Sequence, residues 1–197
     1  MINKKHDLNT QTYKKNHPPK PIMENDSGKP HQGIYVPQNP EKVIGGDVIY
    51  RSGWELAFAQ WCDRNPCVVE WGGEPMCVQY RNPAGVDFDA CKKFGANPQD
   101  PMNWPVANYY PDFYVNLKND EGDELKLIIE IKPKYQTERP VSSLYGSKLK
   151  EQKAYVNAVK TYLQNKAKWE AAIKWCEEKG FEFKVYTEDT LEKMGII

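Results

Sequence analysis

Hydrophobic residues recur with a helical period in the first half of the chain. Trp54, Phe58 and Trp61 follow one another at spacings i, i+4 and i+7, which places them on one face of a helix. Ser52 precedes this stripe, and Glu55 stands three residues after Ser52, which is the spacing of a capping box. We therefore predict an amphipathic helix that begins at Ser52.

Helical spacing returns in the last third of the chain. Residues 147–164 and 166–179 predict two helices, or one interrupted helix, rich in Ala, Lys and aromatic residues. Gly180 is a suitable C-terminal cap. Thr187 can cap a last short helix.

Other segments have the composition and alternation of strands. Gly72-Gly73 separates the first two of them, and residues 82–107, rich in Gly and Pro, are predicted to form an irregular insertion. The order of helix, antiparallel strands, helices and strand predicts an α/β fold with a mixed sheet flanked by helices. The predicted strands are Val68–Trp71, Met76–Tyr80, Tyr109–Leu117, Leu125–Lys132 and Phe181–Tyr186.

The composition excludes several classes of protein. The 197 residues include 27 Lys and Arg and 27 Asp and Glu, and no apolar run approaches the ~18 residues of a membrane-spanning helix. The five cysteines are an odd number without C-x-x-C spacing, so we expect neither a disulfide framework nor a zinc ribbon. We expect a soluble protein of a reducing compartment, without a secretory signal or a membrane partner.

The charges are unevenly distributed, although the net charge is zero. Residues 32–131 carry eight Lys and Arg against fifteen Asp and Glu, whereas residues 132–168 carry nine against two. An acidic region is thus followed by a basic one, which matters more for the choice of partner than the total does. Residues 1–32 are polar, Pro-rich and basic, and are predicted to form a flexible arm.

One predicted hairpin brings charged residues together. If its loop is Asp120-Glu121-Gly122, residues whose numbers sum to 242 face each other, so Asp112 faces Glu130. Directly opposite residues on one face have Cβ atoms roughly 4.5–5.5 Å apart. Lys132 lies on the same face as Glu130, because strand side chains alternate with a period of two. A shift of one residue in the turn would break this arrangement.

Two facing carboxylates repel each other unless something neutralises them. Magnesium suits this pair, because it binds oxygen ligands and uses one or two protein carboxylates. A bound magnesium ion can activate water and stabilise charge on a phosphate, as phosphodiester cleavage requires. Lys132 would orient or deprotonate the water, or offset phosphate charge. The alternative for Glu130 and Lys132 is ordinary charge patterning on an exposed strand.

Pro111-Asp112 and Glu130-Ile131-Lys132 match the signature of the PD-(D/E)XK nuclease superfamily, and the sequence more closely resembles the head completion nucleases of contractile-tailed phages. This resemblance covers about residues 33–193 and implies one nuclease-like domain over 33–197 with a restriction-endonuclease-like fold. It implies Asp112, Glu130 and Lys132 as catalytic residues, with Glu55 as the first-helix acid and Asp112, Glu130 and Glu55 as ligands of Mg²⁺, or alternatively Mn²⁺. The motifs that carry it are Tyr35–Lys42, Ile49–Glu55, Cys62–Pro66, Glu130–Pro133 with Gln136-Thr137, and Lys168–Ala172 with Trp175-Cys176.

The resemblance also implies partners. We expect double-stranded DNA and phage head, portal or neck proteins, in the host cytoplasm during assembly or at the head–tail junction of the virion. Basic and polar residues after the site form a candidate track for the DNA backbone, and the alternative is a solvated loop and helix face. Arg51 could reach a phosphate or pair with Glu55. The candidate DNA-binding residues are Lys134, Gln136, Arg139, Lys148 and Arg51.

Three functions remain open from the sequence. The first is a metal-dependent DNA endonuclease that trims or processes packaged DNA before tail attachment. The second is a structural head-completion or neck protein that uses the nuclease fold without cleaving; the arm and the 82–107 insertion would suit docking. The third is a transposon-end endonuclease subunit, which would require a transposase partner.

Overall fold

A computed structural model describes residues 32–197, so the predicted arm over 1–32 lies outside the described residues apart from Gln32. The chain forms two compact units. The first contains residues through Cys77, together with Tyr110–Ile131 and Cys176–Ile197, and the second contains Val78–Tyr109 and Lys132–Trp175. The polypeptide therefore passes between the units four times, and each unit is assembled from separate segments.

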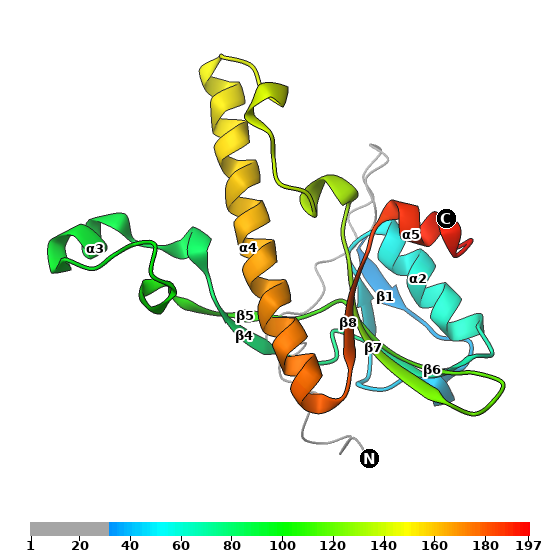
Figure 1. Ribbon diagram of the computed structural model, residues 1–197. Helices are drawn as coiled ribbons and strands as arrows, with labels where there is room; N and C mark the ends of the chain where they lie inside the picture. Colours follow the sequence, from blue (N-terminus) through cyan, green and yellow to red (C-terminus); the bar gives the residue numbers. More distant parts are fainter. Residues whose placement is uncertain (1–31) are drawn as a thin grey trace. The chain divides into compact units, whose positions relative to one another are not determined.

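The first unit is built on a four-stranded mixed sheet in the order β3-β6-β7-β8 (Figure 1). β6 is antiparallel to β3 and to β7, and β8 is parallel to β7. The mixed sheet flanked by helices is confirmed. The unit's elements are β1 (Gly33–Tyr35), η1 (Pro40–Lys42), β2 (Val48–Tyr50), α2 (Gly53–Arg64), β3 (Val68–Gly73), β6 (Phe113–Lys118), β7 (Glu124–Ile131), β8 (Glu182–Tyr186) and α5 (Glu188–Lys193).

The predicted register of the hairpin between β6 and β7 is confirmed. Phe113 faces Ile129 and Lys118 faces Glu124, so the numbers of paired residues sum to 242 along the ladder. The Asn119 amide donates to the Asp123 carbonyl at 3.0 Å. Gly122 has φ +94°, a conformation that glycine adopts at little cost.

Helix α2 begins as predicted. The Ser52 hydroxyl accepts a hydrogen bond from the Glu55 amide at 3.1 Å, and the Glu55 carboxylate accepts from the Arg51 amide at 2.6 Å. Phe58 is fully buried, whereas Trp54 and Trp61 are half-buried. α2 and α5 share one core with the sheet, whose members include Phe58, Ala59, Cys62, Trp71, Phe113, Ile129 and Leu191.

The prediction that Gly72-Gly73 separates two strands is wrong, because both glycines belong to β3. Val43 and Ile44 run beside β3, and the Ile44 amide donates to the Trp71 carbonyl at 2.8 Å. A Cβ atom on Gly72 would lie 2.5 Å from the Ile44 carbonyl oxygen. This glycine therefore allows close backbone approach within a strand.

The second unit corrects two further predictions. Residues 82–107 are not wholly irregular, because Asp87 caps helix α3 (Phe88–Phe94) and Gly95, with φ +66°, ends it. The single strand predicted over Tyr109–Leu117 is two strands in different sheets, since β5 ends at Tyr109 and β6 begins at Phe113. The remaining elements of this unit are β4 (Val78–Arg81), paired with β5 (Val106–Tyr109), the 3₁₀ helices η2 (Pro83–Gly85), η3 (Pro101–Asn103), η4 (Lys134–Gln136) and η5 (Ser142–Leu144), and most of α4.

Helix α4 (Leu149–Lys179) is one continuous helix of 31 residues rather than two helices or an interrupted one. Gly180 follows it with φ +76°, as the predicted C-terminal cap requires. Within the second unit α4 lies against the β4–β5 pair: the side-chain amide of Gln164 donates to the Tyr80 hydroxyl at 2.9 Å. Within residues 32–197, no helix has the length and apolar character needed to cross a membrane.

Candidate active site

The predicted pair of carboxylates lies at one end of the β6–β7 hairpin. Continuing the observed register one step beyond Phe113 and Ile129 brings Asp112 opposite Glu130, with both side chains on the same face. The Asp112 carboxylate reaches across to β7, where its Oδ2 accepts a hydrogen bond of 2.7 Å from the Ile131 amide. The hairpin therefore brings the two predicted acids together.

Glu130 lies near the end of β7, a central strand of the sheet, and is only 2% exposed. A buried carboxylate is costly unless it is paired or coordinates a metal. Asp112, at the start of β6, is half-buried. Among residues 32–197, no group of three or more His, Cys, Asp and Glu side chains is arranged to hold a metal ion. Two carboxylates nevertheless fit Mg²⁺, which completes its coordination with water.

The structure places Glu55 at the first turn of α2 and gives its carboxylate a capping role. Its Oε2 accepts from the Arg51 amide at 2.6 Å, and its Oε1 accepts from the Ser52 hydroxyl at 2.9 Å. These bonds satisfy amide and hydroxyl groups at the helix N-terminus. The part of Glu55 in metal binding stays a prediction.

Arg51 forms an ion pair that the sequence did not reveal. Its Nε and Nη2 atoms donate to Oε1 of Glu74 at 3.2 Å and 2.8 Å. Glu74 directly follows β3, and its amide donates to the Asp112 carbonyl at 2.8 Å. Glu74 therefore contacts the backbone of a predicted catalytic residue, although no periodicity or motif singled it out. The binding of DNA by Arg51 stays a prediction.

The other candidate residues belong to the second unit. Lys132 is half-buried and directly follows β7; Lys134 begins η4 and is exposed. Lys148 is exposed just before α4, where its amide donates to the Glu151 carboxylate at 3.0 Å. Lys134 and Lys148 are therefore exposed to solvent, and Lys132 is partly exposed. The proposed roles of all three lysines stay predictions.

Gln136 and Arg139 line a cavity of about 350 Å³ within the second unit. The side-chain amide of Gln136 donates through Nε2 to the hydroxyl of Tyr135, which is 72% exposed. Tyr145 and Tyr162, the latter on α4, also line the cavity. Aromatic rings beside a cation and an amide suit contacts with nucleic acid.

A further buried acid of the first unit is Asp63, which is completely buried. Its carboxylate accepts from the Tyr35 hydroxyl at 2.8 Å and from the amides of Gln38 and Asn39 at 2.7 Å and 2.9 Å. Burial alone would raise the pKa of Asp63, but these hydrogen bonds outweigh it and hold the pKa below its usual value. Burial and the bond to Asp63 raise the pKa of Tyr35 to about 12.

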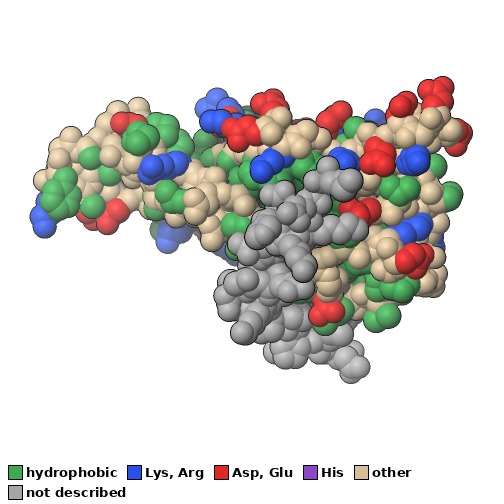
Figure 2. All heavy atoms as spheres, turned by 90° about the horizontal axis from the view of Figure 1, so that it is seen from below, with side chains coloured by type: hydrophobic (Ala, Val, Ile, Leu, Met, Phe, Trp, Pro, Cys, Tyr) green, Lys and Arg blue, Asp and Glu red, His purple; other side chains and the backbone are tan. Residues whose placement is uncertain are grey.

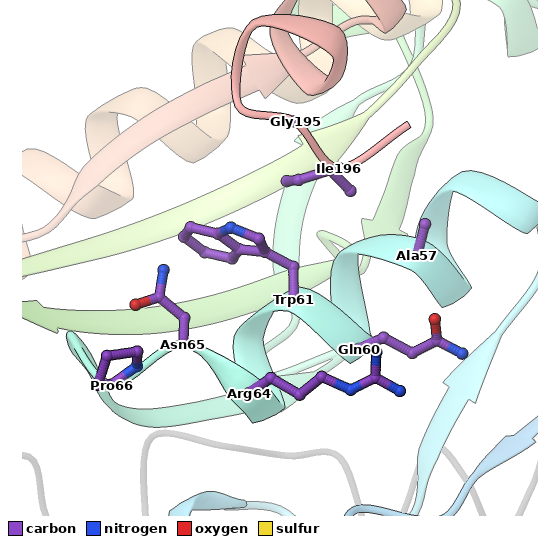
Figure 3. A pocket seen from close by; sticks show the side chains of 8 residues that line it. All are labelled: Ala57, Gln60, Trp61, Arg64, Asn65, Pro66, Gly195 and Ile196. Carbon is purple, nitrogen blue, oxygen red and sulfur yellow. The ribbon is translucent and has the colours of Figure 1, made fainter.

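A larger cavity, of about 440 Å³, lies between α2 and the C-terminal residues Gly195 and Ile196 (Figure 3). Figure 3 shows the Trp61 ring between the helix and this C-terminal segment, with Gln60 and Arg64 along the helix. None of the residues that line this cavity is a predicted site residue. The cavity therefore shares no lining residue with the candidate active site.

A mixed sheet flanked by helices, with an acid before one hairpin strand facing an acid near the end of the next, is the arrangement of the restriction-endonuclease-like nucleases. The family described as TnsA-like endonuclease N terminal matches residues 65–188, and the chain belongs to this family. The matched region contains Glu74, Asp112, Glu130 and Lys132, whereas Arg51 and Glu55 precede it.

One relative shows similarity over most of its length. The chain is 31% identical to the head completion nuclease of Enterobacteria phage T4 over 167 residues. The matched region covers 84% of this chain and 96% of the relative. The resemblance predicted from the sequence motifs is confirmed at the level of the family.

Proposed function

We propose that this chain is a metal-dependent DNA endonuclease that acts in phage head completion. The observation that carries the proposal is the register of the β6–β7 hairpin, which sets Asp112 opposite Glu130 at the end of the strand that leads into Lys132. Membership of an endonuclease family and the similarity to a phage head completion nuclease support it independently.

Asp112 and Glu130 would hold Mg²⁺, or Mn²⁺ in its place, with Glu55 contributing directly or through water. The bound cation would supply an activated water and stabilise the charge that develops on the scissile phosphate. The hydrogen bond from the Ile131 amide fixes one oxygen of Asp112, which orients the carboxylate before any substrate binds.

Lys132 follows the strand that carries Glu130 and is proposed to act on the water nucleophile. It would orient the water, help remove its proton, or offset charge on the phosphate. The water oxygen forms a bond to phosphorus, the bond to the leaving oxygen breaks, and that oxygen takes up a proton. Lys134, Gln136, Arg139, Lys148 and Arg51 are proposed to contact the backbone of double-stranded DNA.

Cleavage of purified DNA tests the enzymatic proposal. The chain is incubated with linear and with covalently closed circular duplexes in Mg²⁺, in Mn²⁺ and in excess chelator. We expect cutting of the circular duplex, because an endonuclease needs no DNA end, and loss of cutting in chelator. Asp112→Ala should lower the cleavage rate at least about 100-fold, at the upper end of the loss seen when residues supporting a metal ligand are removed.

Asp120→Ala is the matched control, because Asp120 is an exposed aspartate in the turn of the same hairpin. It should retain the wild-type cleavage rate. Equal inactivity of the wild type and Asp112→Ala with every cation would contradict the enzymatic proposal, and so would equal activity of the two.

The head-completion role gives the proposed partners and place of action. Packaged double-stranded DNA would be the substrate, processed before tail attachment, and phage head, portal or neck proteins would position the chain. It would act in the host cytoplasm during assembly or at the head–tail junction. Quantifying the chain in purified heads and in tailed particles tests this: we expect it in heads during completion, and its absence from every assembly intermediate would contradict the role.

A structural role is a second candidate, favoured by the segment that carries α3. Phe88, Phe94 and Met102 in this segment are 66%, 76% and 70% exposed, and Figure 2 shows hydrophobic side chains at its surface, at the left of the view. Apolar residues exposed together mark contact sites for other proteins. Under this structural role, phage that carry the cleavage-deficient Asp112→Ala variant should still assemble tailed particles. Failure to form tailed particles would count against the structural role.

A further inference from the structure

We propose that Glu74 is a positioning residue of the candidate active site, which sets the backbone and the carboxylate of Asp112 for cation binding. The inference rests on the proposed function, in which Asp112 binds the cation. It concerns a residue that neither the sequence motifs nor the family resemblance singles out.

The first observation is the position of Glu74. Gly73 pairs with Phe113, and the hydrogen bond from the Glu74 amide to the Asp112 carbonyl, 2.8 Å long, extends this ladder by one residue. On its other side Asp112 is bound to β7 through the Ile131 amide. Asp112 is therefore held between two strands, with Glu74 fixing its main chain and Ile131 fixing its side chain.

The second observation is that Glu74 has an unfavourable conformation. Its φ is +47°, and among residues 32–197 it is the only non-glycine residue with positive φ. Glycine, or asparagine, adopts this left-handed conformation at lower cost than glutamate. Strained residues of this kind gather at functional sites, where the surrounding structure holds them in place.

The third observation is the burial of the carboxylate. The Glu74 side chain is 9% exposed, and its Oε1 accepts both hydrogen bonds from Arg51. Its Oε2 is buried and has no hydrogen-bond partner within the described part of the chain. A buried acceptor without a partner costs free energy. A glutamate that is both strained and incompletely bonded is poorly explained by stability alone.

The ion pair links Glu74 to the start of α2. Arg51 contacts Glu74 through its guanidinium group and Glu55 through its amide. A continuous set of hydrogen bonds therefore joins four separate segments of the first unit, through Glu55, Arg51, Glu74, Asp112 and Ile131. Loss of the Glu74 charge breaks the ion pair with Arg51 that holds residue 74 in its left-handed conformation. The backbone that fixes Asp112 should then shift and cation binding should weaken, although no cation ligand is removed.

The test compares the full-length wild type with Glu74→Gln, which keeps the size of the side chain and removes its charge. Two quantities are measured: the dependence of the cleavage rate on Mg²⁺ concentration, and the rise in melting temperature caused by Mn²⁺. We expect the apparent affinity for the cation or the maximal rate to fall about 10- to 100-fold. The Mn²⁺-induced rise should shrink in the same variant.

Two further variants separate positioning from general stability. Glu74→Gly relieves the backbone conformation but removes the carboxylate, so it should keep a melting temperature close to that of the wild type and still lose cation affinity. Glu182→Gln removes an exposed ion pair with Lys184, 2.9 Å long, and should leave both quantities unchanged. A purely structural Glu74 would lower the melting temperature without changing the cation dependence.

Wild-type cation dependence and a wild-type Mn²⁺ response in Glu74→Gln would overturn this inference while leaving the proposed function intact. If neither the wild type nor Asp112→Ala cleaves DNA, the proposed function fails. The Mn²⁺-induced rise in melting temperature then tests the positioning role of Glu74. A response that Asp112→Ala abolishes and Glu74→Gln reduces would support positioning by Glu74. No response in the wild type would overturn it.

Discussion

The first unit holds two sites with buried or half-buried carboxylates, and these sites differ in how the carboxylate oxygens are bonded. Asp63 has three donors for its carboxylate, from Tyr35, Gln38 and Asn39. Around Asp112, by contrast, continuing the hairpin register by one step brings Glu130 opposite it. Oε2 of the adjoining Glu74 is buried without a hydrogen-bond partner among residues 32–197. The Asp63 carboxylate is thus hydrogen-bonded through both oxygens within the protein, whereas Glu74 keeps one buried oxygen without a donor in the described part of the chain.

This difference distinguishes Asp63, an acid that stabilises the fold, from the acids of the candidate active site. The Asp63 carboxylate fixes the loop before η1, and its backbone carbonyl accepts from the Asn39 side chain and the Lys42 ammonium. Burial at Asp63 is therefore matched by hydrogen bonds. Strain and burial at Glu74 are not matched in this way, which is typical of sites where function has taken precedence over stability.

The largest expected effect on stability follows removal of the Asp63 carboxylate. Asp63→Ala leaves the Gln38 and Asn39 amides and the Tyr35 hydroxyl without their acceptor, and hydrogen bonds to charged groups contribute about 1.5–3 kcal/mol each. We expect the free energy of unfolding to fall by about 3 kcal/mol in urea denaturation. Cleavage per folded molecule should stay at the wild-type level. A loss below about 0.5 kcal/mol, as expected of a surface substitution, would mean that Asp63 does not hold this loop.

A smaller loss of stability is expected when the pH is lowered. Hydrogen bonding lowers the pKa of Asp63 below its usual value, so the folded state releases this proton more readily than the unfolded state. The stabilisation by Asp63 is therefore fully present above about pH 5 and is lost as the pH falls below 4 through the lower folded-state pKa. The difference in unfolding free energy between wild type and Asp63→Ala should narrow over that range. A difference that stays constant from pH 6 to pH 3 would contradict the assignment.

The smallest effect, opposite in sign, is expected at the hairpin acids. Asp112→Asn removes one of two like charges that face each other and keeps an oxygen that can accept from the Ile131 amide. Like charges directly opposite are destabilising, so the variant should be more stable in metal-free buffer by about 0.5 kcal/mol. Thermal unfolding with and without Mn²⁺ measures this change. A loss of stability comparable to that of Asp63→Ala would place Asp112 with the structural acids.

The sequence was sufficient to predict the parts of the molecule set by local rules. Ser52 and Glu55 have the capping spacing and form those bonds, and Gly122 allows the three-residue turn that sets the hairpin register. From that register alone Asp112 is expected opposite Glu130. These features depend on residues close in sequence, or on a pairing that one turn determines.

The parts that the sequence did not predict depend on contacts between distant segments. In the sequence Gly72-Gly73 favours a break between strands, because the close approach of Gly72 to Ile44, 28 residues earlier, cannot be inferred from composition. Glu74 was missed for a similar reason: its partners, Arg51 and Asp112, lie 23 residues before it and 38 after it. Its left-handed backbone would have been expected of glycine.

The pairing of β7 with β8 has a consequence for the synthesis of the chain. β7 carries Glu130, and its parallel neighbour β8 comes from Glu182–Tyr186, more than fifty residues later. Parallel pairing over such a separation forms slowly and requires both segments to be present. While the ribosome is still translating α4, the strand that bears Glu130 has β6 on one side and nothing yet made for the other. The nascent chain therefore reaches a finished sheet only after β8 has been made, which delays completion of the candidate site until that point.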